Sequence, residues 1–395
     1  KGRHDVAQRI IHVLPMRSIG IDLKNRMTSY ANTLSTKGLP VNVEDIGLQQ
    51  MHSPGSPMLC KRFVITTLDT FITSFFKMPA AEIYNVHHYG TAHYEVPRAC
   101  IYSSLVVFDE MHLYIGAQAV NMGKSKSLTA TLACIKSLLR AGVPIVVSTA
   151  TLPTEFKSTI INELVNAGLE DAIEEITPSD ADRKFVDRKL TVSTYTGDVG
   201  ELVQEVGRGK RTLVVLNTVG GAARFYNDSR EKVSDIILLH SRMIEKERSS
   251  RLDRISRMND EFLVVATQVV EAGVDLSFDI LVTETAPPDS LLQRAGRVAR
   301  RGGEGEIYVL PLSDGGARVY GEWLPRETFK QLQVSPSLDN SLLTIYDEVI
   351  EKNEVDLVDL PYRNILNAID EYPSHSLEFA KKVWDIVCGF VREGE

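Results

Sequence analysis

The sequence has no long hydrophobic run and only four cysteines. Both features limit the classes of protein to which it can belong. Its apolar stretches are no longer than single β-strands, and its first residues, Lys-Gly-Arg-His-Asp, show no apolar signal region. We therefore expect neither a transmembrane nor a secretory segment. The four cysteines, Cys60, Cys100, Cys134 and Cys388, are widely scattered and include no Cys-x-x-Cys pair. That usage favours a reduced, cytoplasmic protein whose cysteines are mostly structural.

An excess of basic charge is also missing. Lys and Arg number 44 against 52 Asp and Glu, for a formal net charge of −8. This balance argues against a globally basic nucleic-acid binder but leaves room for a local basic groove. At 395 residues, with 43% hydrophobic and 24% charged residues, the chain is long enough for two or three ordinary globular domains.

The stretch Ser104–His112, S-L-V-V-F-D-E-M-H, carries the first chemical signal. Its apolar residues predict a strand buried on both faces, as in a parallel sheet. Asp109 and Glu110 follow at the carboxyl end, where open α/β sheets place their ligand chemistry. Nucleoside triphosphatases use such a strand to present a metal-orienting aspartate and a water-positioning glutamate. Taken alone, the same residues fit equally well a strand that runs into a solvated acidic turn.

The same design recurs along the chain, with short apolar strands, polar strand tips and helices in alternation. This alternation predicts an α/β fold with parallel sheets. Further strands are expected at residues 9–14, 63–71 (with a helix start), 143–148, 213–218, 236–242, 262–268 and 280–283. Helices are expected at about residues 19–34, 128–139 (followed by Gly142 as a C-cap), 341–353 and 376–392. The polar, proline-containing residues 177–184 predict a linker between two domains.

Asp289–Arg301, D-S-L-L-Q-R-A-G-R-V-A-R-R, is the sharpest signal in the second half. We expect one helix, capped by Asp289 or Ser290, with Gln293, Arg297 and Arg300 on one face. The forked guanidinium groups match phosphoryl oxygens bidentately.

Ala266–Asp275 precedes that arginine-rich stretch. Here Gly273 permits a tight turn, and Asp275 is suited to hydrogen-bond a ribose or an arginine. Taken alone, this is a strand-and-turn segment like many others.

In order and approximate spacing, these segments resemble superfamily 2 helicases. Within that superfamily the chain most resembles the helicase part of the CRISPR-associated helicase-nuclease of type I systems. The similarity covers roughly residues 9–312, and its carriers are residues 105–114, 148–153, 216–219, 239–242 and 288–300. The resemblance implies two tandem RecA-like domains, residues 1–180 and 185–312, that clamp ATP between them. Residues 313–395 would form a small helical C-terminal appendage.

The resemblance also implies roles for single residues. Asp109 would hold Mg²⁺ through water, Glu110 would orient the attacking water, and Gln293, Arg297 and Arg300 would reach the γ-phosphate. Coupling of the nucleotide state to domain closure is implied for His112, Thr149, Thr151, Gly273 and Asp275. Contacts along the nucleic-acid strand, mostly to phosphates and sugars, are implied for Arg17, Thr66, Thr67, Asn217, Thr218, His240, Ser241, Arg242 and Thr267.

Two parts of the family pattern are missing. No G-x-x-x-x-G-K-[ST] phosphate loop precedes Ile10, and Gly123-Lys-Ser125 lacks its first glycine. We expect the sequence to begin just after that loop. The metal-binding residues of an HD nuclease are not recognisable either, because His4-Asp5 is a bare dipeptide and His87, His88 and His93 are more typical of a structural loop. DNA cutting is therefore expected from an HD nuclease domain or subunit outside this chain.

The first hypothesis is an ATP- and Mg²⁺-dependent motor that moves on single-stranded DNA in type I CRISPR interference. Its partners would be the CRISPR surveillance complex and the HD nuclease, with no membrane involved. Two alternatives stay open. One is another DExH helicase for DNA repair or RNA metabolism, and the other is a catalytically silent nucleic-acid-binding fragment without a phosphate loop.

Overall fold

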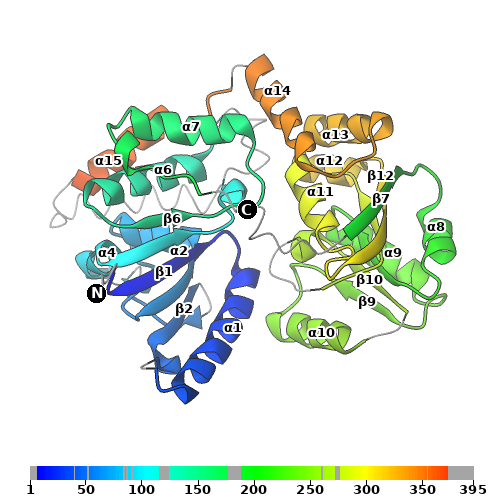
Figure 1. Ribbon diagram of the computed structural model, residues 1–395, viewed down its shortest axis with the longest axis horizontal. Helices are drawn as coiled ribbons and strands as arrows, with labels where there is room; N and C mark the ends of the chain where they lie inside the picture. The colour runs from blue at the N-terminus through cyan, green and yellow to red at the C-terminus, as the bar shows by residue number, and fades with distance from the viewer. Residues whose placement is uncertain are drawn as a thin grey trace. The chain divides into compact units, whose positions relative to one another are not determined.

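A computed structural model shows two compact units, residues 1–174 with 354–395, and residues 175–353 (Figure 1). The structure describes residues 7–39, 41–50, 53–82, 85, 88–89, 93–114, 124–176, 188–258, 261–271, 276–353 and 355–371. Among these residues, no helix is both long and apolar enough to cross a membrane.

The first unit is built on a sheet with the strand order β3-β2-β4-β1-β5-β6. Its strands are β1 (Arg9–Leu14), β2 (Ile46–Gln50), β3 (Ser53–Pro54), β4 (Phe63–Thr67), β5 (Ser104–Phe108) and β6 (Ile145–Val147). All neighbours run parallel except β2 and β3. Val13 of β1 pairs with Thr66 of β4 and with Phe108 of β5, and Phe108 pairs with Val147 of β6. The carboxyl ends of these four strands therefore form one continuous edge.

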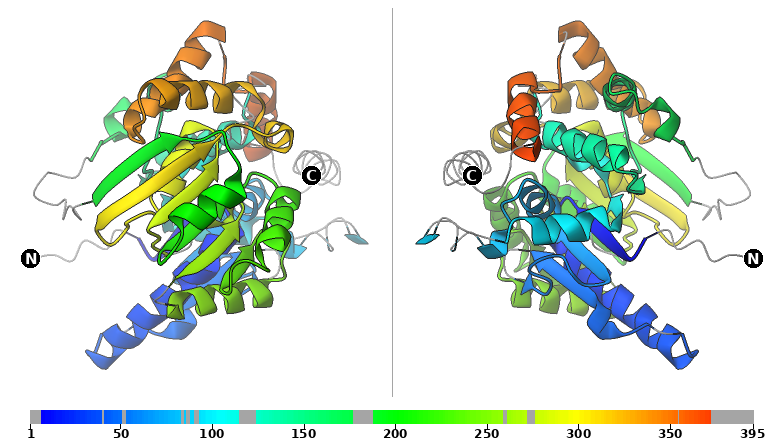
Figure 2. Two further views of the ribbon diagram at one scale, coloured as in Figure 1. Left: turned by 90° about the vertical axis from the view of Figure 1, so that its right-hand side faces the viewer. Right: turned by 90° about the vertical axis from the view of Figure 1, so that its left-hand side faces the viewer.

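Helices cover this sheet because its central strands are apolar on both faces. They are α1 (Arg17–Thr36), α2 (Leu68–Phe75), α4 (Glu95–Tyr102), α6 (Lys126–Arg140), α7 (Thr154–Val165) and α15 (Leu360–Glu371). Short 3₁₀ turns lie at Val43–Asp45, Ala80–Glu82, Met111–Tyr114 and Glu170–Ala172. The last described helix, α15, lies alongside α6, as both figures show (Figures 1 and 2).

The second unit has a parallel sheet with the order β7-β12-β11-β8-β10-β9. Its strands are β7 (Arg188–Thr194), β8 (Arg211–Val215), β9 (Ile236–Leu239), β10 (Phe262–Ala266), β11 (Ile280–Glu284) and β12 (Gly303–Leu310). Its helices are α8 (Val199–Val206), α9 (Val219–Ser229), α10 (Glu245–Arg257), α11 (Pro288–Ala295), α12 (Asp314–Tyr320), α13 (Trp323–Val334) and α14 (Thr344–Asn353), with 3₁₀ turns at Gln268–Val270 and Asn340–Leu343. Ala266 pairs with both Val215 and Leu239, so the ends of β8, β9 and β10 again form one edge.

The α/β class with two parallel sheets is confirmed. One strand differs from its prediction, because β6 is an edge strand of three residues whose Val146 and Val147 are 45% and 44% exposed, not a buried strand. The domain boundaries stay a prediction, since residues 177–187 lie outside the described residues. Within residues 313–371, α12 to α14 belong to the second unit and α15 to the first. The helix expected at 376–392 also lies outside the described residues.

Candidate functional site

The acidic pair lies at the carboxyl edge of the first sheet, directly after β5. The backbone N–H of Asp109 donates to Val13 O at 3.0 Å, which fixes this tip against β1. Glu110 has a φ of 53°, in the left-handed region that non-glycine residues seldom adopt and that is found at functional sites. The Asp109 and Glu110 side chains are 32% and 35% exposed, so both carboxylates reach solvent at this edge.

Asp109 is held by three hydrogen bonds. His12 Nε2 lies 3.1 Å from Asp109 Oδ2, the Ser148 hydroxyl donates to Oδ1, and the Glu110 backbone N–H donates to Oδ1 at 3.1 Å. The bond from His12 lowers the pKa of Asp109, with burial opposing and Ser148 assisting. The carboxylate is therefore ionised and oriented. The His12 contact could not be predicted from local sequence patterns, because it requires β1 to lie beside β5.

Two of the residues expected to couple the nucleotide state, His112 and Thr149, meet beside the acidic pair. Buried His112 places Nδ1 2.9 Å from Thr149 Oγ1 and 3.5 Å from Glu110 Oε2. The Thr149 hydroxyl donates to Thr151 O at 3.1 Å, so Nδ1 must carry the proton that Thr149 accepts. The Thr151 hydroxyl is buried and has no hydrogen-bond partner within the described part of the chain. A continuous chain of contacts thus joins Glu110 to the segment after β6.

The expected nucleic-acid contacts of the first unit differ in exposure. Arg17 is exposed in the first turn of α1. Thr66 is 1% exposed and its hydroxyl donates to Gln49 O at 2.9 Å, while Thr67 is 6% exposed and pairs with the Thr70 hydroxyl. In this arrangement only Arg17 offers its side chain to a strand.

In the second unit, three of the six expected nucleic-acid contacts are buried or hydrogen-bonded within the protein. Asn217 is buried, and its side chain donates to Thr285 O at 2.8 Å and accepts from Arg294 Nη2 at 3.0 Å. Thr218 caps α9 by accepting from Gly221 N, and Thr267 is buried.

The side chains in the segment after β9 are more exposed to solvent. Burial and the nearby Arg251 lower the pKa of half-buried His240, and its Nδ1 has no hydrogen-bond partner in the described residues. Ser241 and Arg242 are exposed. Arg242 is therefore the exposed cation among the expected contacts of the second unit. Gly273 and Asp275 lie outside the described residues.

Arg294 is the largest fully buried side chain of the described residues, and sequence reasoning assigned it no role. Its guanidinium donates to Glu271 Oε1, Thr283 Oγ1 and Glu284 O at 2.8, 2.8 and 2.9 Å, and to Tyr320 Oη at 3.2 Å. Burial raises the pKa of Glu271, which the arginine opposes. This network ties α11 to the ends of β8 and β11.

The arginine segment is not one continuous helix, so that prediction is wrong. The helix α11 begins at Pro288 with no side-chain cap and ends at Ala295, with Gly296 as C-cap. Phe278 pairs with Val298 in a parallel bridge, and Ala299 follows with a φ of 46°. Pairing with the segment before β11 replaces the helix, and Ala299 adopts a left-handed conformation that glycine would adopt at lower cost.

The three residues expected at the γ-phosphate therefore lie in different settings. Gln293 is half-buried on α11, whereas Arg297 is 8% exposed and donates to Val270 O and Glu271 O. Arg300 is exposed on the turn beyond the helix. These three residues do not share one helical face.

Asp109 is the residue at which the fit of the structure to a bound metal ion can be assessed. Among the described residues, no group of three or more His, Cys, Asp or Glu side chains is arranged to hold a metal. Mg²⁺ commonly keeps several waters and binds through one or two carboxylates together with substrate phosphates. An ionised, oriented and partly exposed Asp109 fits that mode.

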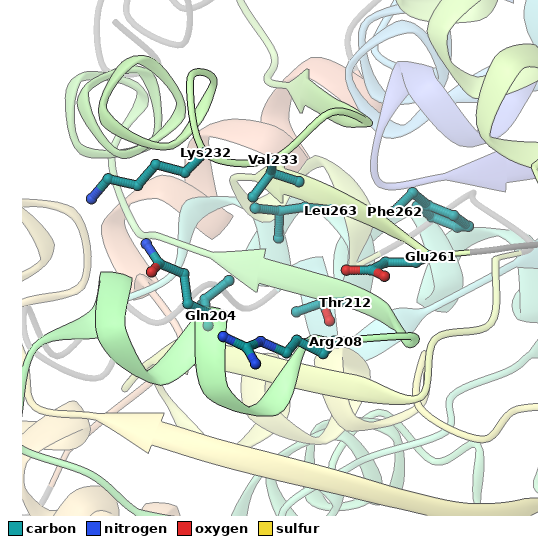
Figure 3. A pocket seen from close by; sticks show the side chains of 10 residues that line it. Gln204, Arg208, Thr212, Lys232, Val233, Glu261, Phe262 and Leu263 are labelled. Atoms are coloured by element: carbon teal, nitrogen blue, oxygen red, sulfur yellow. The ribbon is translucent and has the colours of Figure 1, made fainter.

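A cavity of about 250 Å³ in the second unit lies elsewhere (Figure 3). Thr212 and Phe262, at the amino ends of β8 and β10, line it together with Arg208 and Lys232. The candidate residues lie at the opposite ends of these strands, so this cavity is separate from the proposed site.

Comparisons with known proteins find similarity to Cas3 helicases. The family described as "CRISPR-associated nuclease/helicase Cas3, C-terminal" matches residues 208–303. The CRISPR-associated helicase Cas3 of Thermoproteus tenax is 28% identical over 87% of this chain and 56% of that protein.

Two solved structures share the fold. T. fusca Cas3 with ATP has a TM-score of 0.64 at 18% identity, covering 95% of this chain and 52% of that one. A chain in a CRISPR RNA-guided surveillance complex before nicking has a TM-score of 0.51 at 19% identity, covering 98% and 48%. The chain thus spans about half the length of these relatives.

The two parallel sheets with their helices have the fold of tandem RecA-like domains, which the solved Cas3 structure shares. The matching family model and the curated relatives narrow the class further. The chain resembles the Cas3-type helicases over most of its length.

Proposed function

We propose that this chain is the ATP-dependent motor of a type I CRISPR helicase, which moves on single-stranded DNA. The observation that carries the proposal is the ionised Asp109, fixed by His12 and Ser148, beside Glu110 on a left-handed strand tip. Asp109 would hold Mg²⁺ through water, and Glu110 would orient the water that attacks the γ-phosphate. A bound Mg²⁺ would supply charge neutralisation for the phosphates.

The contacts of His112 support a coupling role. Because Nδ1 faces both Glu110 and Thr149, a shift of Glu110 during hydrolysis changes the partner of His112 and thereby the segment after β6. Arg300 and Gln293 would approach the γ-phosphate from the second unit. Arg297 would do so only after its hydrogen bonds to the carbonyl oxygens of Val270 and Glu271 break.

Hydrolysis by such a motor requires a phosphate-binding loop, and this sequence contains no complete G-x-x-x-x-G-K-[ST] motif. The outer edge of β6 is where a strand leading into such a loop would fit. An exposed strand edge is a template for another strand, and the exposed Val146 and Val147 leave apolar surface there. A parallel strand at β6 would end beside Ser148 and Thr149, next to Asp109.

The test is ATP hydrolysis by the full-length protein with Mg²⁺, with and without single-stranded DNA. Glu110→Gln should abolish hydrolysis while sparing ATP binding, because the neutral amide cannot orient the attacking water as the carboxylate does. Glu231→Gln, at an exposed position after α9, is the matched control and should hydrolyse normally. Unchanged turnover in Glu110→Gln would refute the role assigned to Glu110.

The same assay separates the alternatives. Stimulation by RNA but not DNA, with no binding to the surveillance complex, would favour a DExH helicase of RNA metabolism. A full-length protein that binds DNA without hydrolysing ATP would be a silent binding subunit. Binding to the surveillance complex and delivery of unwound DNA to an HD nuclease would support the CRISPR assignment.

A further inference from the structure

Two cysteines of the first unit lie against each other, far apart in sequence. Cys60 precedes β4, and Cys100 lies on α4, which leads into β5. The Cys100 thiol donates to Cys60 Sγ at 3.2 Å across 40 positions of sequence. A disulfide bond measures about 2.05 Å, so the two sulfur atoms need to approach by only about 1 Å.

The two thiols differ in their access to solvent. Cys60 is exposed and Cys100 is buried. Burial and the neighbouring Cys60 raise the pKa of Cys100 to about 11, with Arg9 acting in the opposite direction. An exposed thiol meets oxidants first, and a buried thiol of raised pKa reacts slowly unless its target is held beside it.

We propose that Cys60 and Cys100 form a reversible redox pair, with Cys60 as the attacking thiol and Cys100 as the resolving thiol. With glutathione disulfide as oxidant, the Cys60 thiolate attacks one glutathione sulfur and releases one glutathione. Cys100 then loses its proton to solvent and attacks Cys60 Sγ, which expels the second glutathione. In total, two cysteine thiols are oxidised and one glutathione disulfide is reduced to two glutathione thiols.

The cross-link would tie the segment before β4 to the helix before β5. Both sites lie at the amino ends of strands whose carboxyl ends carry Thr67 and Asp109. The pair is therefore separate from the proposed nucleotide site. The inference does not depend on ATP hydrolysis.

The experiment maps the thiols of the full-length, folded protein after incubation with glutathione disulfide. Free thiols are alkylated under denaturing conditions, and the tryptic peptides are analysed by mass spectrometry. We expect a linked peptide pair that contains Cys60 and Cys100, lighter than the two free peptides by two hydrogens. Dithiothreitol should restore both thiols, and fully buried Cys134 should stay reduced.

Three variants define the order of reaction. Cys100→Ser should trap a stable glutathione adduct on Cys60, Cys60→Ser should leave Cys100 reduced, and Cys134→Ser should still form the cross-link. Wild-type protein in which Cys60 carries only glutathione, while Cys100 remains a free thiol, would overturn the proposal. So would a cross-link that joins Cys60 to a cysteine other than Cys100.

Discussion

At the scale of single residues, the orientation of Asp109 depends on a histidine from another strand. His12 and Asp109 are 97 positions apart, yet their side chains hydrogen-bond because β1 pairs with β5. Partners of this kind commonly alter metal affinity by about 10- to 100-fold when they are removed. His12 is thus a positioning residue for the proposed magnesium site.

We predict that His12→Phe raises the Mg²⁺ concentration for half-maximal ATP hydrolysis by about tenfold. His12→Gln keeps an N–H donor and should lie closer to the wild-type value. The measurement is a magnesium titration of the ATPase rate in the full-length protein. Equal magnesium requirements in the wild type and both variants would show that this hydrogen bond does not position Asp109.

Residue type alone cannot distinguish a buried structural arginine from an exposed functional one, and the segment 289–301 contains both. Arg294 is fully buried against Glu271, whereas Arg300 is exposed. Arg294→Ala should lower the free energy of unfolding by about 3 to 5 kcal/mol, because it leaves a buried carboxylate unpaired. Chemical denaturation measures this loss.

Arg300→Ala is the complementary change. It should leave the unfolding free energy nearly unchanged and lower ATP turnover by about 10³- to 10⁵-fold if Arg300 reaches the γ-phosphate. Denaturation and ATPase assays on the same samples separate the two effects. Normal turnover in folded Arg300→Ala would contradict its assignment.

At the scale of elements, apolar strands with polar tips were predictable because their patterns are local. The prediction placed β1 at residues 9–14, as observed, and recognised the strand before Asp109. The β7 and β12 strands were missed because one is rich in polar residues, R-K-L-T-V-S-T, and the other begins G-E-G-E. β12 is stabilised by pairing with both β7 and β11, and β7 by pairing with β12; no local pattern encodes such pairing.

The packing of α15 against the first unit also could not be predicted from local sequence patterns. Asp370 of α15 accepts from Arg98 Nη2 at 2.7 Å and from Ser137 Oγ at 2.8 Å. Lys77 also donates to the Asp370 carbonyl. These contacts join residues more than 200 positions apart, so the periodicity of one segment cannot reveal them. The arrangement of Asp109 with His12 depends on sheet order in the same way.

A second contact of α15 predicts a pH dependence. Glu163 of α7 accepts from Lys136 of α6 and from Arg363 of α15, each at 2.7 Å. Burial alone would raise the pKa of Glu163, but these cations outweigh it and hold the pKa below the usual 4.5. A lowered carboxylate pKa contributes stability above pH 4.5 that is lost as the pH falls through the folded-state pKa.

Docking of α15 should therefore weaken in acid. Hydrogen exchange of the α15 amides should quicken as the pH falls below about 4.5, after correction for intrinsic rates. Glu163→Gln should show faster exchange already at neutral pH and a flatter pH profile. Identical profiles in the wild type and the variant would show that this ion pair does not hold α15.

At the scale of the whole molecule, the net charge of −8 makes nucleic-acid binding a local property. The affinity for a single strand then depends on the few cations that reach phosphates. Each neutralised phosphate adds about −0.7 to the slope of log K against log salt. Arg17 and Arg242 are the exposed arginines among the expected contacts, whereas Thr66 is buried.

We therefore predict that Arg17→Ala and Arg242→Ala each weaken single-stranded DNA binding and make the salt slope shallower by about 0.7. Thr66→Val is the matched control, because its hydroxyl faces Gln49 O inside the sheet and should not alter the slope. Fluorescence anisotropy with a labelled oligonucleotide over a series of KCl concentrations measures all three. Unchanged slopes in both arginine variants would place the strand path elsewhere, and a shallower slope in Thr66→Val would show that β4 opens when DNA binds.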